Sequence, residues 1–164
     1  MKKGLKNWTR VCIVAGFAAG SALLLSSCDK DKNDNNNNVP TYTVSGNASG
    51  SQEVPAVTGT GTGTFSGKYD PSTGRLMYTS TYTGLSGAPT SAAFYTGASG
   101  VSGTMTGNAW NLGTGLSATG SVTDTITLTQ DQASQLLSGN LYYSYATTMN
   151  PGGEIRGQLS TTRD

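Results

Sequence analysis

The 164-residue chain contains no histidine, and its cysteines are limited to Cys12 and Cys28. Without histidine, Ser-His-Asp and Cys-His catalytic arrangements cannot form, and imidazole-ligated zinc sites are excluded. Carboxylates are sparse as well, although Glu53 and Glu154 could supply the facing pair that a glycosidase needs. No Asp- or Asn-rich loop of the calcium-binding kind occurs in residues 40–164. An enzyme is therefore the least favoured class, and we expect no cofactor and no bound metal.

The chain also lacks an apolar run long enough to span a bilayer, which takes about 20 residues. Residues 11–25 form a shorter run that follows four basic residues and ends close to a hydrophilic segment. This order of basic, apolar and small residues is typical of a secretory signal. A transmembrane anchor and an ordinary cleaved signal are the alternatives.

Cys28 follows the tripeptide Leu25–Ser27, and this pattern resembles the lipobox of lipoprotein signal peptidase substrates. The resemblance implies that residues 1–27 are removed and that Cys28 becomes the acylated first residue. A diacylglycerol plus an N-acyl chain exceeds the two signals that stable membrane anchoring requires. The mature domain would then contain no free thiol, no disulfide and no thiolate metal ligand.

Residues 28–39 form a second segment, in which residues 29–38 are charged and Asn-rich without an apolar residue. This composition cannot bury a core and predicts a disordered tether. Its acidic residues directly after Cys28 resemble the export signals of some Gram-negative surface lipoproteins. We therefore expect a lipid-anchored protein of the cell envelope, with the outer membrane favoured, on its periplasmic face or at the cell surface.

Positive charge becomes scarce once the signal is removed. The loss of four basic residues changes the formal net charge from +1 to −3, and no basic patch remains. A domain without a basic patch lacks the electrostatic footprint of a nucleic-acid-binding protein. We therefore expect no nucleic acid among its partners.

Residues 40–164 have the size of one domain and are dense in Gly and Thr, with apolar residues at alternate positions. In residues 76–82, for example, Leu76, Tyr78 and two further residues share one face, while Met77 and two threonines share the other. Alternation bounded by Gly-, Pro- and Asn-containing turns predicts β-strands. The pattern predicts strands at 41–44, 64–69, 76–82, 121–128, 141–147 and 154–159, with turns at 70–74 and 150–153.

One helix is predicted after Thr129, because Gln132 completes a capping box and Gly139 supplies a C-terminal stop. Ala133, Leu136 and Leu137 would form its apolar stripe. The fold class is therefore mainly β: an immunoglobulin-like antiparallel β-sandwich or barrel-like domain with one short helix. Disorder of the whole domain is the alternative that the Gly and Thr content raises.

Several motifs together resemble the CHRD domain over about residues 41–160, and the closing segment Asn150–Leu159 is the most specific of them. The others are Gln52–Pro55, Leu76-x-Tyr78, Tyr82-x-Gly84-Leu85 and Leu136-x-x-Gly139-x-Leu141-Tyr142. The family occurs in the extracellular developmental regulator chordin and in many exported microbial proteins. The resemblance implies a β-rich, immunoglobulin-like exported domain, and it brings little mechanism because the molecular activity of the family is mostly unassigned.

Members of this family usually carry an Ala-His-x-His segment and a further histidine before the Asn-Pro-x-Gly-Glu turn. Here Ala93, Tyr95 and Ala146 occupy those three positions. If the family's histidines bind a metal or perform acid–base chemistry, this chain has lost that ability. Ala93 has no donor atom, and neutral Tyr95 is a poor metal ligand. No site is therefore transferred from the family.

Three charged residues of the motifs are given a structural role. Glu154 and Arg156 are two apart on a predicted strand and point to the same face. Arg156 would pair with Glu154 or Glu53 and fix the last strand, and we expect a partly buried ion pair between Glu53 and Arg156. The alternative is a charged feature that binds a ligand.

Aromatic residues offer the other candidate for ligand contact. Tyr142 faces opposite to Tyr143 and Tyr145, so one set is expected in the core and the other at the surface. With Tyr95 and Trp110, an exposed row could stack on a sugar or on a partner protein. Ordinary core and rim packing is the alternative.

Thr125 lies in the tripeptide Asp124-Thr125-Ile126, which matches a short O-glycosylation pattern of exported proteins in some Gram-negative bacteria. This identifies Thr125 as a possible modification site.

The sequence therefore favours a lipid-anchored, non-catalytic module of the cell envelope that interacts with an envelope protein or a glycan. The alternative is a structural envelope component without a defined ligand. A contiguous exposed aromatic or apolar patch would support binding, and a polar, featureless surface would support the structural role.

Overall fold

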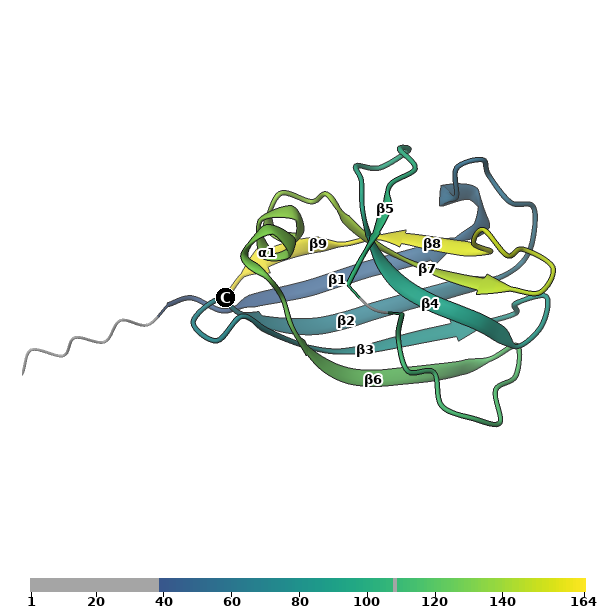
Figure 1. Ribbon diagram of the computed structural model, residues 1–164, viewed down its shortest axis with the longest axis horizontal. Helices are drawn as coiled ribbons and strands as arrows, with labels where there is room; N and C mark the ends of the chain where they lie inside the picture. Colours follow the sequence, from purple (N-terminus) through teal and green to yellow (C-terminus); the bar gives the residue numbers. More distant parts are fainter. Residues whose placement is uncertain (1–38, 108) are drawn as a thin grey trace, which may run out of the picture. The chain divides into compact units, whose positions relative to one another are not determined.

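The computed structural model describes residues 39–107 and 109–164 (Figure 1), and residues 37–164 form one compact unit. The predicted signal sequence, Cys28 and the tether up to residue 38 lie outside the described residues. Within the described part, no helix combines the length and the apolarity needed to cross a membrane.

The described chain is built from β-strands and two short helical segments. Six strands follow the order of the predicted ones, and three further strands, β4, β5 and β9, lie where no strand was predicted. The elements are β1 (Tyr42–Ser49), the 3-10 helix η1 (Gly50–Gln52), β2 (Thr62–Asp70), β3 (Arg75–Thr83), β4 (Pro89–Thr96), β5 (Thr104–Thr106), β6 (Gly120–Thr127), α1 (Gln130–Leu137), β7 (Leu141–Thr147), β8 (Ile155–Gln158) and β9 (Ser160–Arg163).

All nine strands belong to one antiparallel sheet, ordered β5-β4-β7-β8-β1-β2-β3-β6, with β9 also paired to β1. The sheet curls into a half-barrel, so that its two ends approach each other around a common core (Figure 1). The predicted fold class, a mainly β antiparallel domain with one short helix, is confirmed. A single curled sheet provides both walls of the core.

The period-2 pattern of β3 decides which side of this wall faces inward. Leu76, Tyr78, Ser80 and Tyr82 are buried, and the residues between them are exposed. The turn before β3 needs a residue with positive φ, which Gly74 supplies at +69°. The remaining core residues include Val44, Phe65, Leu85, Phe94, Val122, Leu136, Leu141, Ile155 and Leu159.

Helix α1 forms as its capping signals predict. The Thr129 hydroxyl oxygen accepts a hydrogen bond from the Gln132 amide, and the Gln132 side-chain oxygen accepts one from the Thr129 amide, which completes the capping box. Gly139 ends the helix with φ +71°. Leu136 is fully buried, whereas Leu137, predicted on the same stripe, is exposed.

Candidate functional site

The segment Asn150–Leu159 is the most specific family motif. It starts in the turn between β7 and β8 and continues through β8. Glu154 lies at the end of this turn with 3% of its surface exposed. Its carboxylate accepts hydrogen bonds from the Ser86 amide at 2.6 Å, from the Ser86 hydroxyl, from the Thr147 hydroxyl at 2.5 Å and from the Asn150 side chain at 3.2 Å. Glu154 thus joins its own turn to the loop before β4.

These bonds also determine the protonation of Glu154. Burial raises its pKa, but the hydrogen bonds from Ser86, Thr147 and Asn150 outweigh burial and hold the pKa below its ordinary value of 4.5. The carboxylate therefore stays charged and saturated with donors. It has the environment of a structural carboxylate rather than of a general acid or base.

Arg156 lies on β8 and is 1% exposed, which makes it the largest fully buried side chain among the described residues. Its guanidinium donates to the carbonyls of Val101 and Ala98, both at 2.8 Å, and to Gln158 Oε1 at 3.1 Å. It also lies 3.5 Å from the centre of the Tyr142 ring. Arg156 therefore fixes the loop between β4 and β5 over the outer face of β7.

The predicted ion pair between Glu53 and Arg156 is wrong in its geometry. Within residues 39–107 and 109–164 the one salt bridge joins exposed Lys68 to Asp164 at 2.7 Å. Arg156 is satisfied by backbone carbonyls more than 50 residues away, a partnership that strand periodicity cannot reveal. Burial raises the pKa of Glu53, and the charge of Arg156, acting at longer range, opposes part of that rise.

Glu53, directly after η1, reaches the same outer face of β7. It accepts a hydrogen bond from the Ser144 hydroxyl at 2.6 Å. Burial raises the pKa of Glu53, and this effect exceeds the opposing effects of Ser144 and Arg156. Gly153 packs against the pair with φ +129°, and a Cβ at that position would lie 2.5 Å from Glu53 Oε1. The glycine is required by this close approach and by its backbone conformation.

The three positions where family members carry histidine lie together on this face. In the antiparallel register of β4 and β7, Ala93 is opposite Ser144 and Tyr95 is opposite Tyr142, while Ala146 is the next residue of β7 on that face. Tyr95 stacks on Tyr142 with ring centres 5.2 Å apart. The fold thus brings the three positions together, but it places two methyl groups and a phenol there. Among the described residues, no group of three acidic, His or Cys side chains is placed to hold a metal ion.

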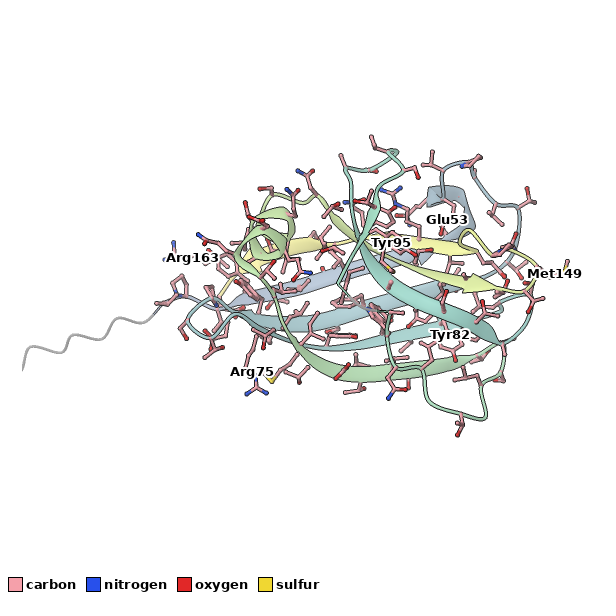
Figure 2. All side chains as sticks on the ribbon, viewed as in Figure 1. Glu53, Arg75, Tyr82, Tyr95, Met149 and Arg163 are labelled. Carbon is pink, nitrogen blue, oxygen red and sulfur yellow. The ribbon has the colours of Figure 1, made fainter. Side chains whose placement is uncertain are left out.

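Two hollows open at this end of the sheet, around the label of Glu53 in Figure 2. A small polar hollow of about 90 Å³ lies between Glu53, Tyr95 and Arg156. A neighbouring groove of about 290 Å³ has both polar and apolar walls, and 75% of Met149 and 39% of Val54 are exposed there. We call the apolar residues of this groove the end patch: Val54, Pro55, Val57, Met149 and Pro151.

The predicted exposed aromatic row does not form. Tyr143 and Tyr145 are fully buried, and Trp110 is 8% exposed. These rings pack together between the walls of the half-barrel, with Trp110 and Tyr145 edge to face at 5.5 Å. The side chains on the inward face of β7 therefore belong to the core, which agrees with the alternative of ordinary core packing. Of the four candidate aromatic residues, Tyr95 is the one that lines a hollow at the outer face of β7.

Thr125 is exposed on β6, a strand that pairs on one side with β3. O-glycosylation at this residue stays a prediction.

The chemistry of the site is that of recognition and support. Glu53 is a carboxylate with a raised pKa, but its neighbours are a serine that donates to it and an arginine bound to carbonyls. Glu154 is occupied by four donors. What sequence analysis missed is the end patch, because its residues come from the loop after η1 and from the β7–β8 turn, which are far apart in the chain.

Comparison with known proteins agrees with the motifs. The model of the CHRD domain matches residues 44–159, which covers strands β1 to β8 apart from the first two residues of β1 and leaves out β9. No curated protein and no solved structure matched the chain. The family is not known as catalytic, and membership favours a module of the interaction type. The chain belongs to the CHRD domain family.

Proposed function

We propose that the protein is a non-catalytic interaction module, held in the cell envelope by lipid on Cys28, whose end patch contacts a protein partner. The observation that carries this proposal is the contiguity of the patch: the exposed apolar side chains of Val54 and Met149 line one groove. An exposed, contiguous apolar surface on a soluble domain is typical of a binding site. The groove also borders Glu53, so a partner with an apolar side chain next to a basic or amide group would fit it.

The place of the end patch supports this role. The chain enters the domain at β1, and β1 leads directly to η1 and Val54. Eight strand residues at about 3.3 Å each separate the two ends by about 25 Å. Figure 2 shows Met149 and Glu53 at one end of the sheet and Arg163, near the start of β1, at the other. If the chain is anchored on its N-terminal side, the patch faces away from the attachment.

Lipid anchoring predicts a localisation that depends on one residue. In cells expressing the full chain, Cys28→Ala should move the protein from the membrane fraction to the soluble fraction. Cys12→Ala is the matched control and should leave the protein in the membrane fraction, because Cys12 lies within the predicted signal. Membrane retention of the Cys28→Ala variant would contradict the lipoprotein proposal.

A photo-crosslinking amino acid tests the end patch within the full chain. We expect position 149 to give a discrete protein adduct in intact cells, and Val54→Asp to reduce it several-fold by placing a charge in the groove. Position 77 is the control, because Met77 is also exposed (52%) but lies on β3, outside the patch. Equal adducts from both positions, or none from 149, would reject the proposal, and the second result would favour a structural envelope component.

A further inference from the structure

A third hollow lies inside the half-barrel, where the two ends of the curled sheet face each other without pairing. Strands β4 and β5 border it on one side and β6 on the other, next to α1. Its volume is about 440 Å³, within the usual range of about 300–1,000 Å³ for small-molecule sites. Six apolar side chains line it: Phe94, Ala109, Trp110, Ile126, Leu128 and Leu141.

Asp124 lines this cavity at its solvent-exposed rim, and its position is unusual. On β6 the residues that share its face are Val122 and Ile126, and its register partner on β3 is buried Tyr78. The carboxylate therefore occupies an inward position that is otherwise apolar. Its one hydrogen bond within the described chain comes from the amide of Thr125 at 2.7 Å. No basic residue lines the cavity among the described residues, so Asp124 has no counter-ion there.

Two buried hydrogen-bond donors lie at the same place. Trp110 Nε1 and the Tyr78 hydroxyl are buried, and neither has a partner among the described residues. The two rings pack against each other with centres 5.0 Å apart, and Trp110 forms part of the cavity wall. Burial raises the pKa of Tyr78, and the charge of Asp124 raises it further, so the phenol stays a donor. Unpaired buried donors cost about 1–3 kcal/mol each and favour a ligand that brings an acceptor.

We propose that this cavity binds a small apolar amine whose body carries a hydroxyl or carbonyl oxygen. Asp124 would pair with the ammonium group, the apolar walls would enclose the body, and Trp110, which forms part of the wall, would donate to the oxygen. A cavity of about 150 Å³ already holds a benzene ring, so an aryl-alkyl amine fits the available volume. This site is separate from the end patch and does not depend on the proposed partner.

Tyramine is a suitable probe, because it combines an ammonium group, an aromatic body and a hydroxyl. Binding to the full chain in detergent is followed through the indole N–H signal of Trp110, assigned with the Trp8→Phe variant. We expect tyramine to shift this signal and to bind roughly ten-fold more tightly than 4-ethylphenol, which lacks the ammonium, and than 2-phenylethylamine, which lacks the hydroxyl.

Asp124→Asn should remove the preference for tyramine over 4-ethylphenol, whereas Asp131→Asn should preserve it. Both side chains are exposed and both substitutions remove one charge, but Asp131 lies on α1 outside the cavity wall. Thermal unfolding of both variants confirms that they are folded. No shift with tyramine, equal affinity for tyramine and 4-ethylphenol, or an unchanged preference in Asp124→Asn would overturn the proposal.

Discussion

Replacement of Glu154 by alanine is expected to lower the free energy of unfolding by about 2–4 kcal/mol. The substitution removes the acceptor of four hydrogen bonds and leaves the fully buried Thr147 hydroxyl without its carboxylate partner. It also disconnects the β7–β8 turn from the loop that leads to β4. Chemical denaturation at pH 7 measures the loss.

The pH dependence of this effect separates the charge of Glu154 from its packing. Because the folded-state pKa of Glu154 lies below 4.5, its charged form stabilises the fold above that value, and this contribution disappears as the pH falls through the folded-state pKa. The difference in the free energy of unfolding between the wild type and Glu154→Ala should therefore become smaller under acidic conditions. Asp131→Ala, an exposed carboxylate on α1, should change stability by less than about 0.5 kcal/mol. Equal losses in the two variants would contradict the structural role of Glu154.

Replacement of Arg156 by methionine is expected to lower the free energy of unfolding by a similar amount, about 2–4 kcal/mol, and to lower the melting temperature by roughly 10 °C. Methionine fills much of the volume but cannot donate to the carbonyls of Ala98 and Val101, and the contact with the Tyr142 ring loses its charge. In this variant, exchange of the backbone amide hydrogens should accelerate more in the loop between β4 and β5 than in the rest of the sheet.

Arg156→Lys distinguishes charge from geometry. Lysine keeps the positive charge, but it lacks the planar fork that reaches two carbonyls and Gln158 at once. We expect it to recover less than half of the lost stability. If Arg156→Met were as stable as the wild type, the assignment of Arg156 as the support of this loop would be wrong.

These two residues show what the family motif does in this chain. Within Asn150–Leu159, Ile155 and Leu159 enter the core, Glu154 and Arg156 fix loops, and Gly157 lies directly under the Tyr143 ring, where a Cβ would come within 2.4 Å. The motif therefore encodes the architecture of the domain. Positions 93, 95 and 146, where this chain carries Ala, Tyr and Ala, lie outside this motif.

Much of the fold follows from local patterns. The alternation in residues 76–82 predicts β3 and its buried face, because a strand turns successive side chains to opposite sides. The capping box at Thr129 and Gln132 predicts the start of α1, because both hydrogen bonds are made within one turn. Strand β4 was missed because its central residues Ala92, Ala93 and Phe94 are buried on both faces and show no alternation.

By itself, the sequence determined the strand periodicity, the helix cap, the absence of histidine chemistry and the likeness to CHRD domains, all of which depend on residue type and short spacing. Only the tertiary structure decided which partners the long-range side chains meet. It placed Arg156 on carbonyls of the β4–β5 loop, buried Tyr143 and Tyr145, and set Asp124 at the rim of the cavity in the half-barrel. The physical reason is that strand order and register set these contacts, and both arise from the closure of the whole sheet.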